Sequence, residues 1–217
     1  MGRSAVEIEI RDPVPEGLTV FETMRQEADG SVALWPLHLQ RLRRDCRAVG
    51  FPLDEVGVAD ALQGAPGAVT RLRLAVGTTG RAEVTRARMP PRPDQWRVVL
   101  SQHRLDSTDP WLRIKTSQRP VYDAARAALP PGMDEAILLN ERGEVCEGTI
   151  TSLFLRRDAQ LLTPPLACGL LPGVLRQSLL NAGRAVVAVL LPDDLATGDL
   201  LMGNALRGLI PARLATA

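Results

Sequence analysis

Apolar and polar residues alternate cleanly along one segment in the first half of the chain. Leu72, Leu74 and Val76 fall on one side of an extended backbone, and Arg71 and Arg73 fall on the other. This period of two predicts a half-buried strand. Apolar runs bounded by turn residues predict further strands, so that the expected strands of this half cover 5–10, 18–25, 31–35, 69–76, 82–88 and 96–101.

Apolar residues recur at helical spacing between these strands. Leu39, Leu42 and Cys46 lie on one face of a helix that Pro36 can open and Gly50 can end. A second short helix is predicted over 54–62. The first half is therefore expected to be α+β, with an antiparallel sheet covered by helices on one face.

The polar stretch 103–110 is the best candidate for a domain boundary, and the proline-rich segment 89–93 reads as a loop within the first half. We therefore predict an N-terminal α+β domain over 1–108 and a C-terminal domain over 109–217. The elements predicted in the C-terminal domain are helices over 121–129 and 172–182, and strands over 135–140, 185–190, 200–203 and 209–211. A pair of short strands around Gly148 is predicted over 145–155.

Bulk composition excludes several classes of function. A net charge of +1 gives no electrostatic case for binding nucleic acid. No stretch approaches the roughly 20 apolar residues that span a bilayer, and the N-terminus has no signal-like apolar core, which indicates a cytoplasmic protein. The three cysteines lack metal-ligand spacing and only two histidines are present, so we expect no metal site.

One compositional feature points to chemistry. Among 26 lysines and arginines, Lys115 is the only lysine. Arginine can replace lysine as a surface cation but is a poor imine former, whereas a lysine amine can lose its proton and attack a carbonyl. A single lysine can also survive by chance, so composition alone leaves both explanations open.

Two turns downstream could bind an anion. The segment 147–154 combines Glu147 with a glycine and three hydroxyl side chains between two strands. The segment 171–176 runs through Gly173 into a predicted helix start, which is a potential phosphate site. Each feature alone is also typical of ordinary structure. Together with Lys115, they provide an amine, an acid and two anion-binding turns, which are the parts that a pyridoxal phosphate site requires.

These residues resemble the fold-type IV pyridoxal phosphate enzymes, the class IV aminotransferase family. This family includes branched-chain and D-amino acid aminotransferases and aminodeoxychorismate lyases. The resemblance covers nearly the whole chain, in order. Its parts are VFETMR at 20–25, HLQRL at 38–42, IKT at 114–116, DEAILLN at 134–140, GEVCEGT at 143–149, SLF at 152–154, TPPL at 163–166, GLLPGVLR at 169–176 and NALRG at 204–208.

The resemblance implies a two-domain fold, with an N-terminal α+β sandwich and a C-terminal pseudo-barrel with helices. It implies that Lys115 is the catalytic Schiff-base lysine and that Glu147 pairs with the pyridine nitrogen. It also implies a homodimer whose partner completes each cleft. The residues expected to contact the cofactor's phosphate, several through backbone N–H groups, are Arg41, Thr149, Ile150, Thr151, Val174, Leu175 and Ala205.

The chain departs from the family pattern at several points. Residues 15–19 replace a glycine-rich loop that many relatives carry, and Ala205 lacks a hydroxyl that often contacts phosphate. Arg119 stands where aminotransferases often have a tyrosine, and the only tyrosine is Tyr122. Arg119 and the Asn-Ala-Leu segment at 204–206 look more like the lyase branch.

The leading functional prediction is therefore a lyase that converts 4-amino-4-deoxychorismate to 4-aminobenzoate and pyruvate in folate precursor synthesis. The alternatives are an aminotransferase for branched-chain or D-amino acids, and a cofactor-binding paralogue without turnover. The substrate in each catalytic case is a small amine. Its candidate contacts, which could equally be structural or surface residues, are Thr23, Arg25, His103, Arg119 and Arg207.

Overall fold

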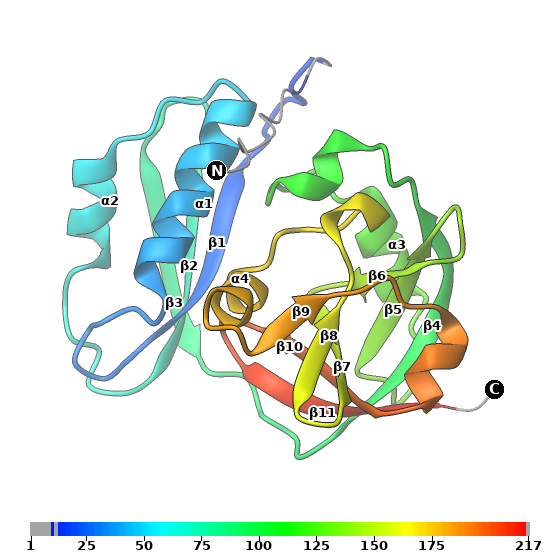
Figure 1. The fold of residues 1–217 in the computed structure, drawn as a ribbon. Helices are drawn as coiled ribbons and strands as arrows, with labels where there is room; N and C mark the ends of the chain where they lie inside the picture. Colours follow the sequence, from blue (N-terminus) through cyan, green and yellow to red (C-terminus); the bar gives the residue numbers. More distant parts are fainter. Residues whose placement is uncertain (1–9, 11–12, 216–217) are drawn as a thin grey trace.

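A computed structural model describes residue 10 and residues 13–215 (Figure 1). The strand predicted over 5–10 therefore lies outside the described residues except for its last position. Within the described part, no helix combines the length and apolar character needed to cross a membrane.

The N-terminal part is a three-stranded antiparallel sheet in the order β1-β2-β3. Its strands are β1 (Val20–Gln26), β2 (Thr70–Val76) and β3 (Ala82–Arg88). Helices α1 (Trp35–Ala48) and α2 (Glu55–Leu62) pack on one face, where their apolar residues meet Leu72, Leu74 and Val76 in a single core. The alternation in β2 therefore turns its arginines to the opposite face of the sheet.

The prediction of a strand over 31–35 is wrong. Only one isolated bridge joins Gln26 to Val32, and α1 already begins at Trp35. Leu34 has a φ of 58°, so the backbone turns out of the extended conformation immediately before the helix.

The C-terminal part is a sheet of eight strands in the order β10-β11-β4-β5-β6-β7-β8-β9. An additional pairing of β10 with β7 closes six of these strands into a barrel. The strands are β4 (Trp96–Leu105), β5 (Glu135–Asn140), β6 (Val145–Gly148), β7 (Ser152–Arg157), β8 (Gln160–Thr163), β9 (Ala185–Val187), β10 (Asp199–Asn204) and β11 (Gly208–Leu214). Apolar side chains from β4, β5, β7, β10 and β11 form a common core.

Two longer helices and three short 3-10 helices accompany the barrel: α3 (Pro120–Ala127), α4 (Val174–Asn181), η1 (Pro110–Arg113), η2 (Leu166–Cys168) and η3 (Pro192–Ala196). The pseudo-barrel with helices is thus present. Strand β8 had not been predicted.

The sequence suggested that the strand over 96–101 belongs to the N-terminal sheet, but strand β4 does not join it. It pairs in parallel with β5 and β11, so it belongs to the barrel. The change of sheet falls in the proline-rich segment 89–93, between β3 and β4. Proline cannot donate to a strand ladder, which makes this segment a natural break. The division into domains at 108/109 stays a prediction, but the two sheets separate earlier.

The chain returns to the first sheet just before α3. The N–H of Phe21 donates to the Lys115 carbonyl at 3.0 Å, and the N–H of Ser117 donates to the Thr19 carbonyl at 2.9 Å. Residue 115 therefore lies where the N-terminal sheet meets the barrel, and Figure 1 shows these two parts side by side.

Candidate active site

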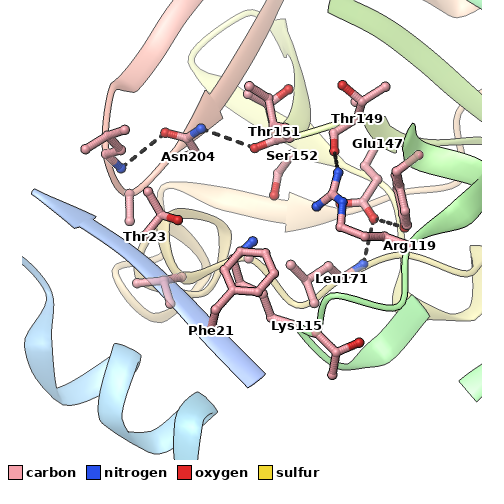
Figure 2. Close-up of a pocket in the computed structure, with 18 of the residues that line it drawn as sticks. Phe21, Thr23, Lys115, Arg119, Glu147, Thr149, Thr151, Ser152, Leu171 and Asn204 are labelled. Carbon is pink, nitrogen blue, oxygen red and sulfur yellow. Dashed lines mark hydrogen bonds between the residues drawn. The ribbon is translucent and has the colours of Figure 1, made fainter. Parts of the chain in front are cut away.

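Lys115 lines a cavity of about 560 Å³ at this junction. Its Nζ lies 4.6 Å from the centre of the Phe21 ring. The backbone N–H of Lys115 donates to the carboxylate of the buried Asp45 at 2.8 Å. Burial, aided by the charge of Arg41, lowers the pKa of the Lys115 amine to about 7. The amine is thus substantially neutral near pH 7, as a nucleophile or base must be. Figure 2 shows it beside the Phe21 ring.

Glu147 faces the same cavity from β6 and is almost fully buried. Its Oε1 accepts a hydrogen bond from the Tyr122 hydroxyl at 2.6 Å. It also accepts one from the Leu171 N–H at 2.8 Å (Figure 2). Within the described residues, Oε2 has no such partner and is left to meet a ligand. Burial raises the pKa of Glu147 to about 7 despite these bonds. The sequence had not linked Tyr122 to Glu147.

Arg41 reaches the cavity from α1, held by an acid on β1. Its Nε and Nη2 donate to the two carboxylate oxygens of Glu22 at 2.7 and 2.5 Å. His38 Nδ1 lies 2.7 Å from the same carboxylate. Arg41 Nη1 points toward the Pro172 carbonyl, 3.4 Å away, just before α4. The motif HLQRL therefore holds its arginine beside the N-terminus of a helix.

The buried Glu22–Arg41 pair makes a stability prediction. Burial alone would raise the pKa of Glu22, but Arg41 and His38 hold it at about 2. Since this value lies below the ordinary 4.5, the stabilisation is present above pH 4.5 and is lost as the pH falls toward 2. Glu22→Gln at pH 7 is expected to lower the free energy of unfolding by about 3 kcal/mol, because it leaves the Arg41 charge unpaired.

Urea denaturation measures this change, and the chain supplies a matched control. Glu55 pairs with Arg43 in the same two-bond geometry but on the surface. Glu55→Gln is expected to leave the free energy of unfolding nearly unchanged, because solvent screens exposed pairs. Equal effects of the two substitutions would contradict a special role for the buried pair.

The turn at 149–151 lines the cavity, but a protein carboxylate already uses several of its donors. Buried Glu135 accepts from the N–H groups of Thr149 and Ile150 at 3.0 and 3.2 Å, and from the Thr151 hydroxyl at 2.9 Å. Arg126 Nη1 also donates to Glu135 Oε1 at 3.2 Å. The predicted phosphate contacts of these three residues stay a prediction. Glu135 was missed, although an acid opening the apolar run of β5 was a signal that it had a specific partner.

The start of α4 and the turn between β10 and β11 complete this part of the wall. Gly173 precedes α4, and a Cβ there would come within 2.5 Å of the Ser152 hydroxyl, so a larger residue would require the Ser152 side chain to move. Val174 follows on the cavity wall, while the side chain of Leu175 packs into the C-terminal core. Ala205 also lines the cavity. The first N–H groups of a helix have no partner within it and favour an anion.

The predicted substrate contacts divide into two groups. Thr23, Arg119 and Arg207 line the cavity, and Arg119 Nη2 donates to the Thr149 carbonyl at 2.6 Å (Figure 2). Arg25 and His103 lie outside the lining. Arg25 is engaged by Glu27 at 2.7 Å, on β1 beyond the cavity.

An amine, a buried acid with a free oxygen, an arginine and the N-terminus of a helix preceded by glycine thus surround one cavity. Comparison with known proteins then identifies the family. The family model described as amino-transferase class IV matches residues 19–215. The chain belongs to the class IV aminotransferase family.

Solved structures of related proteins agree with this assignment. A Mesorhizobium loti protein, provisionally named an amino-acid aminotransferase, is 43% identical, with a TM-score of 0.86 over 91% of this chain and 100% of that one. The 4-amino-4-deoxychorismate lyase of Pseudomonas aeruginosa is 26% identical, with a TM-score of 0.76 over 98% and 88%. A provisionally named Mycobacterium tuberculosis aminotransferase, solved with pyridoxal phosphate bound, is 25% identical, with a TM-score of 0.81 over 90% and 81%.

These relatives confirm the predicted fold and cofactor. The fold is that of the fold-type IV pyridoxal phosphate enzymes, and the cofactor is pyridoxal 5′-phosphate. The cavity fits this group on its own evidence. It offers an amine for the aldehyde, a free Glu147 oxygen for the ring nitrogen, and the N-terminus of α4 at Gly173 and Val174 for the phosphate.

Proposed function

We propose that this family member is a lyase that converts 4-amino-4-deoxychorismate to 4-aminobenzoate and pyruvate, a step in folate precursor synthesis. The observation that carries the proposal is Arg119, which stands where aminotransferases often have a tyrosine and whose guanidinium lines the cavity beside Thr149. The nearby Tyr122 donates its hydroxyl to Glu147 instead. We also propose that the enzyme acts as a homodimer, as the family resemblance implies.

Four residues of the cavity receive a role toward the cofactor in this proposal. Bound pyridoxal phosphate supplies an electron sink for negative charge on the carbon that bears the substrate amine. Lys115 would hold the aldehyde, Glu147 the ring nitrogen, and Arg41 with the Val174 N–H the phosphate. The Lys115 amine is also the base of the cavity, because burial keeps it neutral enough near pH 7 to take a proton from substrate carbon.

Glu147 has the second chemical role. Two hydrogen bonds fix its Oε1, so the carboxylate cannot rotate freely and presents Oε2 to the ring nitrogen. An anion at this position keeps a proton on that nitrogen, which sustains the electron sink. In the overall reaction, the side chain of the substrate ring leaves as pyruvate, and loss of the ring proton makes the remaining ring aromatic.

A product assay tests the proposal. Enzyme loaded with pyridoxal phosphate is expected to form 4-aminobenzoate and pyruvate in equal amounts from 4-amino-4-deoxychorismate, as measured by chromatography and a coupled pyruvate assay. Lys115→Ala provides the blank. Absence of both products, together with amino transfer from amino acids to 2-oxoglutarate, would contradict the lyase assignment.

The second candidate is an aminotransferase for branched-chain or D-amino acids. It is favoured by the 43% identity to the Mesorhizobium loti protein, which carries an aminotransferase name. The third is a cofactor-binding paralogue without turnover, favoured by Ala205 and the altered segment 15–19. The same assay separates all three, because only the first forms 4-aminobenzoate, only the second transfers an amino group to 2-oxoglutarate, and the third does neither.

A further inference from the structure

Several arginines that have no assigned role in binding the cofactor line the same cavity. Five of them form what we call the arginine band, and they come from β2, from the residue preceding α3, from α3, and from the turn between β10 and β11. The band consists of Arg71, Arg73, Arg119, Arg126 and Arg207.

Sheet geometry explains why β2 contributes two of these side chains. Arg71 and Arg73 alternate with leucines that are buried against α1 and α2, so they project from the other face of the sheet. The Arg73 guanidinium lies 3.8 Å above the centre of the Phe21 ring, the same ring that Lys115 approaches. The band therefore extends to the reacting amine.

The turn after β10 places Arg207. The side chain of Asn204 accepts from the Arg207 N–H at 3.0 Å, which fixes the backbone of this turn. The Arg207 guanidinium lies 5.6 Å from the centre of the Trp96 ring. Its Nε and Nη1 are buried and have no hydrogen-bond partner among the described residues. A buried donor without an acceptor is costly, so these two Arg207 donors favour an anionic ligand.

Carboxylates of the protein neutralise the band only in part. Arg119 pairs with the largely exposed Asp123 at 3.1 Å, and Arg126 shares Glu135 with the turn at 149–151. Within the described part of the chain, no carboxylate pairs with Arg71, Arg73 or Arg207.

The arginines also act on one another. Burial lowers the pKa of Arg73, and Arg119 and Arg71 lower it further. Burial, Arg126 and Arg71 do the same for Arg207. Each guanidinium of the band thus experiences the charge of others, and an anion between them would relieve the repulsion.

We propose that the arginine band selects a substrate amine that carries two carboxylates, with Arg73 and Arg207 as the residues that decide this preference. The proposal rests on the proposed function only in taking this cavity as the substrate site. One carboxylate is satisfied by a single guanidinium fork, so the unpaired arginines exceed what an ordinary monocarboxylic amino acid needs. Arg41 is not counted, because Glu22 neutralises it and it faces the phosphate region.

The experiment compares two unreactive probes that share a benzene ring. Benzene-1,3-dicarboxylate and benzoate are titrated into enzyme loaded with pyridoxal phosphate, and binding is followed by calorimetry and by the cofactor absorbance. The dicarboxylate is expected to bind at least tenfold more tightly, a difference of about 1.4 kcal/mol that an additional charged hydrogen-bonded pair supplies. The preference should shrink as salt is raised.

Variants assign the preference to residues. Arg73→Gln and Arg207→Gln should each bring the affinity for the dicarboxylate to within about twofold of the affinity for benzoate. The change should come mainly from weaker binding of the dicarboxylate. Arg73→Lys should retain part of the ratio, because it keeps the charge but loses the planar fork. Arg88→Gln is the matched control, because Arg88 is an exposed strand arginine outside the cavity lining. Unchanged melting temperatures and cofactor content confirm that the variants fold.

The outcomes separate this inference from the lyase proposal. Equal affinities of the two probes for the parent enzyme, or an unchanged ratio in both Gln variants, would overturn the inference even if 4-aminobenzoate is formed. In a different outcome, the parent enzyme prefers the dicarboxylate and both Gln variants lose that preference, while no 4-aminobenzoate is formed. That outcome would uphold the inference and overturn the lyase proposal. The substrate would then be another dicarboxylic amine.

Discussion

Lys115→Ala is expected to abolish turnover and to remove the near-visible absorbance band of bound cofactor. The substitution deletes the only side-chain primary amine of the protein, which serves both to hold the cofactor aldehyde and to accept the substrate proton. Losing a nucleophile and a base together is expected to lower kcat by roughly 10⁴-fold or more. Steady-state kinetics and an absorbance spectrum after reconstitution measure the two effects.

Lys115→Arg distinguishes amine chemistry from charge. The guanidinium keeps a cation in the cavity but stays protonated and forms imines poorly, so this variant should be as inactive as the alanine variant. Since the wild-type amine has a pKa of about 7, a permanent cation at this position is not a close substitute. Turnover at the parent rate by Lys115→Arg would show that residue 115 does not act through its amine.

Glu147→Gln is the substitution with the second largest expected effect. An amide can accept the hydrogen bonds of Tyr122 and Leu171 but cannot hold a proton on the ring nitrogen by charge. We expect kcat to fall roughly 10²- to 10³-fold, in the range of a lost acid–base contribution. The cofactor band should persist with a shifted maximum, which stopped-flow and static spectra resolve.

Tyr122→Phe is the graded control for Glu147. It removes one hydrogen bond to Oε1 while Leu171 retains the other, so a smaller fall in kcat is expected than for Glu147→Gln. A Glu147→Gln enzyme with the parent kcat and spectrum would contradict the assigned pairing of this acid with the ring nitrogen.

The sequence predicted those site features that residue chemistry or the family resemblance can reveal. Lys115 stood out because amine chemistry cannot be performed by arginine, and Glu147 and Arg41 followed from the ordered family pattern. The alternation in β2 also predicted that Arg71 and Arg73 share one face of a strand. Sequence could not say that this face meets the barrel across a cavity, because that depends on how the two sheets pack.

Other features depend on pairing between distant segments. Strand β4 has the alternation of an ordinary strand, and nothing local specifies that it pairs with β5 and not with β3. Glu135 reaches the turn at 149–151 only because β5 and β6 are neighbours in the barrel. Tyr122 meets Glu147 only because α3 packs beside the same strands. Such partners are invisible to spacing and periodicity.

The most direct test of the account is to locate the cofactor on the chain. Enzyme loaded with pyridoxal phosphate is reduced with borohydride and digested, and the peptides are mapped by mass spectrometry. The account predicts that the bleached cofactor is covalently attached at Lys115, and that Lys115→Ala yields no labelled internal peptide. A protein that binds the cofactor but carries no label at Lys115 after reduction would contradict the central claim.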